Sequence, residues 1–334
     1  MMAASGVLAD AAGARASAKP FFRTRGVVLV PEDLSLADWP ERARRAGLTT
    51  IALHPTPSAV EPFVRSHAGQ AFLARCKDLG IEVEYELHAM ADLLPRALFD
   101  RNPDMFRCDE HGTRVRDANL CVHSTQALEI VAENAVRVGR ALKPSTKRYF
   151  FWGDDGAPWC RCPKCRALTD SDQALLLENH LVKALRAVTP GASVAHLAYA
   201  NTLRPPTSVK PAAGVFLEFA PINRRYDTPF AEQSGPEFPE RLEHLDANLA
   251  VFPKSAAQVL EYWLDCSRFS GWRKPAVKVP WRADVFRADL DAYGKRGIRH
   301  ITTFAVYIDA DYVAQHGEPP LDEYGAGLRG WPTR

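Results

Sequence analysis

Short runs of β-branched and aromatic residues recur along the chain, and more polar stretches separate them. Such runs, bounded by turn residues, are typical of buried β-strands. We therefore predict eight strands, over residues 25–30, 49–54, 81–88, 148–153, 193–199, 214–219, 258–263 and 299–306.

Most of the stretches between these runs carry apolar residues at helical spacing. They predict six helices, over residues 36–46, 60–79, 126–142, 171–188, 236–248 and 284–296. Glycine or proline follows five of the six, as expected where helices end. Residues 201–213 break the pattern, because this stretch is rich in proline and too short for a crossover helix.

Strands that alternate with helices form parallel sheets, because each parallel connection has to cross the sheet. Eight such units predict a closed (β/α)8 barrel, or TIM barrel, as a single domain over residues 21–334. We expect residues 1–20, which are rich in small side chains, to form a flexible arm. The alternative is an open doubly wound sheet, but the chain carries no phosphate-loop motif to support the nucleotide binding typical of that fold.

The overall composition excludes some classes of protein. Basic and acidic residues nearly balance, 42 against 40, so bulk charge does not make the chain a nucleic-acid or membrane-surface binder. No run of about 18 apolar residues occurs, so we expect no membrane span. The N-terminus lacks the basic start and apolar stretch of a secretory signal, and the cysteine spacing suits a metal better than disulfides. We therefore expect a cytoplasmic protein.

Polar and aromatic side chains gather where the predicted strands end. In a TIM barrel the loops after the strands form the active face, and here the longest span residues 89–124 and 154–170. Aromatic rings beside carboxylates suit a carbohydrate, whose C–H faces pack on rings while its hydroxyls hydrogen-bond to acids. We expect a carbohydrate substrate to contact His88, Trp152, Tyr199, Arg224, Tyr262, Trp263 and Tyr307.

The pair Asp154 and Asp155 follows the fourth predicted strand and precedes Gly156. Both acids can face the barrel mouth if the chain turns tightly at that glycine. Two close carboxylates repel each other, which raises the pKa of one and lets it act as an acid near neutral pH. The alternative is that one aspartate caps the loop while the other is solvated.

A glycosidase needs a second carboxylate across the mouth, and Glu261 and Glu218 are the candidates by strand position. Each glutamate has an alternative role as the ion-pair partner of an arginine inside the barrel. Arg224 and Arg225 follow the sixth strand and suit either that pairing or a bidentate grip on a substrate carboxylate.

Three cysteines, Cys160, Cys162 and Cys165, lie within six residues of the second long loop. Their spacing can offer three thiolates to one tetrahedral zinc. Cys108 and Cys121, both in the other long loop, are candidates for the fourth ligand, so a zinc would join the two loops. A closed site of four thiolates is structural rather than catalytic. The alternative is three reduced thiols in a surface loop.

The run Phe151-Trp-Gly-Asp-Asp-Gly-Ala-Pro-Trp-Cys-Arg-Cys-Pro-Lys-Cys-Arg-Ala-Leu168 resembles the signature of domain-of-unknown-function family 4838. Residues 102–121 and 197–211 look similar to the family as well. The resemblance covers about residues 80–310. It implies a barrel related to glycoside hydrolases, including α-glucuronidase-like and hexosaminidase-like enzymes. It also implies that Asp155 is the family aspartate, that His88 is a family histidine and that Cys121 completes the metal site. Asp154 departs from the family, in which asparagine is frequent there, so the resemblance favours Asp155 as the essential acid.

These observations together predict a glycoside hydrolase in which Asp155 acts as general acid and base, or orients a substrate group that attacks its own anomeric carbon. We expect a structural zinc, no organic cofactor, and no nucleic-acid or membrane partner. Two alternatives stay open. A non-catalytic sugar-binding barrel would keep the aromatic residues but lack a partner carboxylate within reach. A sugar isomerase or epimerase would bind a divalent ion through Glu86, His88, Asp154, Glu218 and Asp309.

Overall fold

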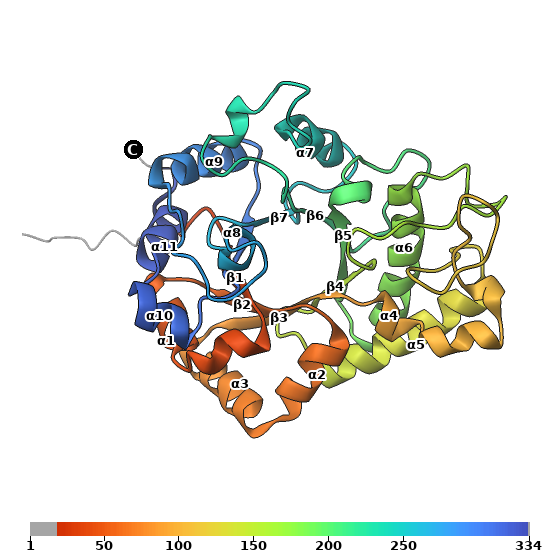
Figure 1. Cartoon of the computed structure of the whole chain (residues 1–334), viewed down its shortest axis with the longest axis horizontal. Coiled ribbons are helices and arrows are strands. Elements are labelled where there is room, and N and C mark those ends of the chain that lie inside the picture. The colour runs from red at the N-terminus through yellow and green to blue at the C-terminus, as the bar shows by residue number, and fades with distance from the viewer. Residues whose placement is uncertain (1–18, 333–334) are drawn as a thin grey trace, which may run out of the picture.

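The computed structural model describes residues 19–332, in which eight parallel strands close into one barrel (Figure 1). Each strand pairs with the next along the chain, and the last pairs with the first, with Thr24 opposite His300. This closure confirms the predicted (β/α)8 barrel and excludes the open sheet, whose edge strands would stay unpaired. The strands are β1 (Thr24–Leu29), β2 (Thr50–Leu53), β3 (Glu82–His88), β4 (Arg148–Trp152), β5 (Ser193–Ala198), β6 (Val215–Phe219), β7 (Gln258–Glu261) and β8 (His300–Phe304).

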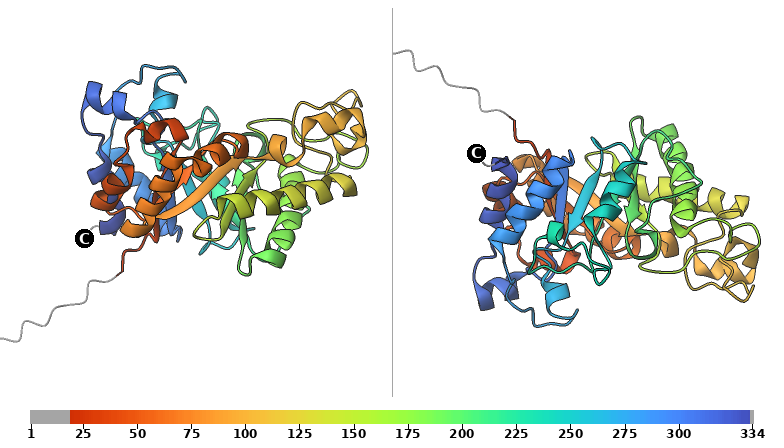
Figure 2. Two further views of the ribbon diagram at one scale, coloured as in Figure 1. Left: turned by 90° about the horizontal axis from the view of Figure 1, so that it is seen from below. Right: turned by 90° about the horizontal axis from the view of Figure 1, so that it is seen from above.

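The structure has helices between and after the strands, and most of them pack around the outside of the barrel, as Figures 1 and 2 show. They are α1 (Trp39–Ala46), α2 (Pro57–Arg65), α3 (His67–Leu79), α4 (Met90–Leu93), α5 (Thr125–Leu142), α6 (Asp170–Val188), α7 (Leu242–Leu249), α8 (Cys266–Phe269), α9 (Ala283–Lys295), α10 (Ala310–His316) and α11 (Leu321–Gly330). Local chemistry sets their ends: the Ser124 hydroxyl accepts from the Ala127 amide at the start of α5, and left-handed Gly47 ends α1. None of the helices within residues 19–332 combines the length and the apolar character needed to span a bilayer.

Two of the predicted helices differ from the structure. The segment predicted as one helix over residues 60–79 is split into α2 and α3, because Ser66 is extended and its hydroxyl caps the amide of Gly69. The helix predicted over residues 236–248 is shortened to α7, because Pro239 and the extended Arg241 precede its first turn. The flexible arm expected at residues 1–20 lies almost wholly outside the described residues.

Residues 325–330 carry glycines at the spacing of a dinucleotide-binding turn, yet they lie inside α11 rather than between a strand and a helix. Gly325 has a packing role instead. A Cβ there would lie 1.9 Å from the carbonyl oxygen of Ala46, so the absent side chain lets α11 approach α1 closely.

Side chains alternate along each strand between the helices and the barrel interior. A polar layer fills the lower interior, where the Arg148 side chain donates to Gln258 across the barrel at 2.7 Å. Gln258 in turn donates to Glu218 at 2.8 Å and to Glu86 at 3.2 Å. Trp152 donates its indole N–H to the same Glu218 at 2.9 Å. These side chains fill the barrel interior beneath the Trp152 ring.

The two long loops meet beside the barrel, where the loop after β3 projects past α5 and α6 (Figures 1 and 2). Asp154 fastens them together: its carboxylate accepts from the backbone amides of Asn119 at 2.7 Å and Ala91 at 3.1 Å, and it pairs with Arg96. The side-chain oxygen of Asn119 in turn accepts a hydrogen bond from the backbone amide of Asp154 at 2.9 Å. The backbone on either side of Asp155 is therefore held by the neighbouring loop.

Candidate functional site

A cavity of about 310 Å³ opens at the carboxyl ends of the strands, where TIM-barrel loops carry function. Its volume falls at the lower end of the range of small-molecule sites, about 300–1,000 Å³. Aromatic rings form much of the wall, with few charged groups among them. The polar and aromatic side chains that line it are His54, His88, Trp152, Asp155, Tyr199, Tyr262, Asp265, Ser267, Trp272, Phe304 and Tyr307.

The structure places Asp155 and five of the seven expected substrate contacts in this cavity. The five are His88, Trp152, Tyr199, Tyr262 and Tyr307. The remaining two, Arg224 and Trp263, lie elsewhere, as do the other expected carboxylates. His54, Asp265 and Trp272 also line the cavity, although they were not expected substrate contacts.

Asp155 lies at the mouth of the cavity, with 66% of its side chain exposed. One carboxylate oxygen is 3.7 Å from Nε2 of His88. The Nδ1 of His88 is 2.8 Å from the carbonyl oxygen of Gly153, which can only accept, so Nδ1 carries the proton. Burial and the Asp155 carboxylate raise the pKa of Tyr199 above its ordinary value, so its hydroxyl stays a donor. Asp155 is therefore a solvated carboxylate between an imidazole and a phenol.

Asp265 is a second carboxylate on the cavity wall, and only 4% of this residue is exposed. Burial raises its pKa above the ordinary value for an aspartate. The Ser267 hydroxyl and the amides of Ser267 and Arg268 all donate to Oδ1, at 2.5, 3.1 and 3.3 Å. Within the described part of the chain, Oδ2 has no hydrogen-bond donor and is available to a ligand.

The two carboxylates reach the cavity from well-separated strands. Asp155 follows β4 and Asp265 follows β7, three strands further round a ring of eight. They therefore enter the mouth from nearly opposite sides. Asp265 lies only a few residues beyond the seventh strand, so its position in the sequence marks it as an acid in a loop of the active face. Strand alternation does not predict which way its side chain points, because the strand has already ended.

His54 supplies an uncharged acceptor to the same cavity. Its Nδ1 is 2.8 Å from the carbonyl oxygen of Glu86, so this nitrogen carries the proton. Burial lowers the pKa of His54 to about 3, with a smaller effect from His88. The ring is therefore neutral near pH 7, and Nε2 can accept from a ligand hydroxyl.

Glu218 lies beneath the cavity rather than on its wall. It is fully buried in the barrel, where it holds Trp152 and Gln258 through the hydrogen bonds described above. Burial raises the pKa of Glu218 to about 8. From this position Glu218 supports the Trp152 ring. It does not reach a substrate, so its expected role as a partner carboxylate does not fit the structure.

Glu261 lies outside the cavity, in a buried ion-pair cluster between β7 and α9. Arg224 contacts Glu261 at 3.1 Å and Asp289 at 2.5 Å, and the Tyr293 hydroxyl donates to Glu261. The cause is strand alternation: Leu260 lines the cavity, so Glu261 points toward the helices. The expected roles of Glu261 as partner carboxylate and of Arg224 as substrate contact therefore do not fit the structure, and the alternative ion pair does.

Trp263 points the same way as Glu261, because two residues separate side chains on one face of a strand. Its indole N–H donates to Asp289 at 3.0 Å, and its ring packs on Phe286 with centroids 5.0 Å apart. Trp263 is thus a packing residue behind the barrel wall, where a substrate does not reach it.

Asp154 and Asp155 do not share the cavity. Asp154 is held by Arg96 and the amides of Asn119 and Ala91, so it fits the alternative in which one aspartate of the pair orders the loop. The positive φ of Gly156 provides the turn that separates the two side chains.

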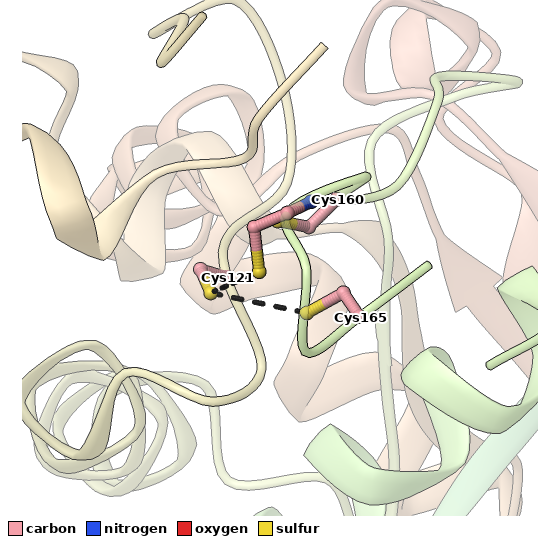
Figure 3. Close-up of side chains that lie close together, drawn as sticks. Cys121, Cys160 and Cys165 are labelled. Atoms are coloured by element: carbon pink, nitrogen blue, oxygen red, sulfur yellow. Dashed lines mark hydrogen bonds between the residues drawn. The ribbon is translucent and has the colours of Figure 1, made fainter. Parts of the chain in front are cut away.

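Four buried cysteines from the two long loops converge beside the barrel. The sulfurs of Cys121, Cys160, Cys162 and Cys165 all lie within 4.8 Å of one another. Figure 3 shows Cys121 on one loop, with its sulfur directed toward Cys160 and Cys165 on the other. The arrangement can hold a metal ion. Cys108 is not in the set; instead its backbone amide donates to the sulfur of Cys160 at 3.2 Å.

No second metal-ligand cluster forms in residues 19–332, where groups of three or more His, Cys, Asp or Glu ligands converge only at these cysteines. The ligands expected for a metal-dependent isomerase are scattered. Glu86 and Glu218 lie inside the barrel, Asp154 is paired with Arg96, and Asp309 caps α10. The geometry therefore does not support that alternative.

Solved structures of glycoside hydrolases share this fold. The chain superposes on Gan42B, a GH42 β-galactosidase from G. stearothermophilus, with a TM-score of 0.56 and 13% identity, over 92% of this chain and 57% of that one. With the catalytic domain of β-amylase from Paenibacillus polymyxa the TM-score is 0.55 and the identity 11%, over 91% of this chain and 97% of that one. With β-galactosidase from the psychrophilic Marinomonas ef1 the TM-score is 0.52 and the identity 12%, over 91% of this chain and 59% of that one. The chain thus spans somewhat more than half the length of the two β-galactosidases, and at these identities the likeness shows the fold alone.

The sequence comparison is more specific. No curated protein matches this chain. A family model described as a domain of unknown function, DUF4838, matches residues 23–249, which is more than half of the sequence. The match includes the cavity residues from β2 to β5 and all four clustered cysteines. The chain therefore belongs to the DUF4838 family.

Proposed function

We propose that this protein is a glycoside hydrolase that cleaves a carbohydrate in the cavity at the carboxyl ends of the strands. One observation carries the proposal: Asp155 and Asp265 enter an aromatic-lined cavity from the β4 and β7 sides. Cleavage of a glycosidic bond uses two carboxyl groups that flank the bond. The names of the fold neighbours, two β-galactosidases and a β-amylase, support the carbohydrate class.

The environments of the two aspartates assign their roles. Asp265 is buried, and burial raises its pKa and favours its neutral form, so we assign it the role of the acid that donates a proton to the leaving oxygen as the C–O bond breaks. Asp155 is exposed, so it is the carboxylate that takes a proton from the attacking water or attacks the anomeric carbon itself. This differs from the expectation that Asp155 is the acid, because burial favours the neutral form of Asp265 instead.

The remaining wall residues bind and orient the sugar. The Trp152, Tyr262 and Tyr307 rings offer flat apolar faces for sugar C–H groups. His54 accepts from a hydroxyl through its neutral Nε2, and Tyr199 donates a hydrogen bond at the Asp155 side. His88, at the end of β3, lies 3.7 Å from the Asp155 carboxylate and helps to set its position.

Hydrolysis of a panel of aryl glycosides and short oligosaccharides tests the proposal. We expect release of product from at least one member, and a loss of about 10²-fold or more in kcat for Asp155→Asn and for Asp265→Asn. Asp311→Asn, an exposed aspartate in the first turn of α10, serves as the control and keeps wild-type turnover. Sugar binding by the wild type without turnover would support the non-catalytic sugar-binding barrel instead.

We also infer that the four cysteines hold a structural zinc ion. A zinc with four sulfurs at about 2.3 Å places those sulfurs about 3.8 Å apart in a tetrahedron. The sulfur of Cys121 lies 3.8 Å from that of Cys162 and 3.9 Å from that of Cys165, which fits. The Arg114 guanidinium, 3.7 Å from the sulfur of Cys160, offsets part of the negative charge of a four-thiolate site. The zinc would supply rigidity to the two loops and no chemistry to the reaction.

A further inference from the structure

We propose that the carbohydrate is anionic, and that a groove beside the cavity binds the carboxylate of a uronic acid unit through Arg268. The proposal rests on the proposed function and names its substrate class. The groove, called the arginine groove below, has a volume of about 800 Å³. Its polar and aromatic lining includes Arg225, Tyr226, Arg268, Phe269, Trp281 and Arg282.

Arg268 is held in a fixed position with its charge unpaired. Its guanidinium lies 4.6 Å from the centre of the Tyr226 ring and 5.7 Å from that of Phe269. Its Nε donates to the carbonyl oxygen of Ile222 at 3.0 Å. Among residues 19–332 no carboxylate comes within 4 Å of it. One of its terminal nitrogens also donates to the carbonyl oxygen of Arg224 at 3.5 Å. A guanidinium held by rings and two carbonyls, with N–H donors left over, is prepared for a carboxylate that arrives from outside.

The other arginines of the groove already have partners. Arg225 forms a bidentate pair with Asp227, and Arg282 forms one with Asp284. Arg224 is neutralised by its buried partners. Among the arginines that line the groove, the charge available to a ligand is therefore that of Arg268.

The loop that forms one side of the groove is basic over its whole length. Residues 262–282 contain a single acidic residue, Asp265, which faces the cavity. The same stretch contains the five basic residues Arg268, Arg273, Lys274, Lys278 and Arg282. Lys274 pairs with Asp309 and Arg282 with Asp284, whereas the other three have no ion-pair partner among residues 19–332. In a chain whose total charge is only +2, these three charges on one loop direct anionic ligands to this part of the mouth.

The arginine groove adjoins the cavity, because neighbouring residues of the same segments line both. Asp265, on the cavity wall, caps α8, and Arg268 lies in that same short helix. Ile222 lines the cavity and accepts the hydrogen bond from Arg268. The Tyr226 ring of the groove lies 6.3 Å from the Tyr262 ring of the cavity. A sugar chain bound at Asp265 would thus reach Arg268 with a neighbouring unit.

Two aromatic rings near the groove, one exposed and one half-buried, suit sugar faces. Trp272 is 64% exposed and lines the cavity, and Trp281 lines the groove. Rings and arginines also bind single-stranded nucleic acid, but that mode uses a positive groove that tracks many phosphates. Here one unpaired arginine lies next to a small cavity with two carboxylates, which favours a short acidic sugar.

Binding of matched charged and neutral sugars tests the proposal. The probes are uronic acid oligosaccharides from pectate, alginate and hyaluronan, each compared with its methyl-esterified form, in which the charge is removed and the ring is kept. Isothermal titration of the wild type should give affinities at least about tenfold higher for the acid of one of these pairs than for its ester, the effect of a charge-assisted hydrogen bond. This advantage should shrink as NaCl is raised from 20 to 500 mM, because salt screens exposed charges.

Two variants connect the preference to Arg268. Arg268→Gln should remove most of the advantage of the acid form, because it lowers the affinity for the acid much more than the affinity for the ester, which lacks the charge. Arg44→Gln, an exposed arginine at the end of α1 on the opposite face of the barrel, should leave both affinities unchanged. The wild-type comparison needs no variant, so the test stands even if Arg268→Gln folds poorly.

The outcomes separate this proposal from the proposed function. Equal affinity for acid and ester, or for neutral sugars only, would overturn the anionic substrate and leave the glycoside hydrolase intact. Tighter binding of a single-stranded oligonucleotide than of any uronate would overturn the assignment of the groove to a sugar. Absence of binding by every sugar in the set, charged or neutral, would overturn both proposals.

Discussion

The carboxylate of Asp155 lies 3.7 Å from Nε2 of His88, at the mouth of a cavity lined by aromatic rings. Its neighbour in sequence, Asp154, has turned the other way and pairs with Arg96. The two consecutive acids thus have separate tasks: one is free for a substrate, and the other orders the loops that position it.

Asp154→Asn should destabilise the protein by about 1–3 kcal/mol, because Arg96 loses its charged partner in a half-buried site. The loss should appear as a lower Tm, with the kcat of the folded fraction reduced much less than in Asp155→Asn. An unchanged Tm combined with a kcat loss as large as that of Asp155→Asn would place Asp154 in the chemistry and contradict the loop role.

Asp265→Asn should act selectively on the leaving group. A general acid is needed only where the departing oxygen is basic, so the variant should lose about 10²-fold or more in kcat/KM on oligosaccharides. It should lose far less on dinitrophenyl glycosides, whose leaving group departs without a proton. Wild-type activity should also fall as pH rises through the raised pKa of Asp265, because the acid must be protonated. Equal losses on both substrate types would remove Asp265 from the acid role.

Cys121→Ser should abolish zinc binding. Atomic emission should give one zinc per chain for the wild type and none for the variant, together with a loss of about 4 kcal/mol or more in unfolding free energy. Cys76→Ala, in α3 and outside the cluster, provides the matched control and should keep its zinc. Wild-type protein that carries no zinc, even after refolding with the metal, would contradict the metal site.

Glu218→Gln should flatten the dependence of stability on pH. Burial raises the pKa of Glu218 to about 8 in the folded state, against the ordinary value of 4.5 for an unfolded chain. The folded protein therefore holds a proton that the unfolded chain has lost, and stability falls as pH rises between these values. The slope reaches at most about 1.4 kcal/mol per pH unit for one group.

Urea unfolding at pH 5 and pH 8 measures this effect. The wild type should lose stability between the two values, and Glu218→Gln should lose less. Glu129→Gln, on the exposed face of α5, should follow the wild type. An identical decline in wild type and Glu218→Gln would show that Glu218 does not take up the proton.

Much of the fold could be predicted because each strand is a compact run between clear breaks. The turn at Gly156, the glycine after α1 and the spacing of three cysteines are local signals, and local signals are readable in a sequence. The position of Asp155 at the cavity follows from the same logic, since it directly follows a strand in a barrel.

The wrong predictions have a common physical cause. The direction of a side chain depends on its contacts with residues that are far away in the sequence. Apart from Glu261, residues 259–263 are apolar or aromatic at both alternating sets of positions, so the pattern did not reveal that Leu260 points in and Glu261 out. Asp265 was overlooked because it lies past the strand, in a turn that caps α8. The choice between Cys108 and Cys121 needed the path of a long loop, which spacing alone does not fix.

The most direct test of the central claim is the turnover of Asp155→Asn against that of Asp311→Asn on a glycoside that the wild type hydrolyses. Both variants remove one aspartate charge from a loop or helix start that follows a strand, and only Asp155 faces the cavity. We expect a loss of about 10²-fold or more in kcat for Asp155→Asn, with unchanged Tm and sugar affinity, and no loss for Asp311→Asn. Wild-type turnover in Asp155→Asn would contradict it.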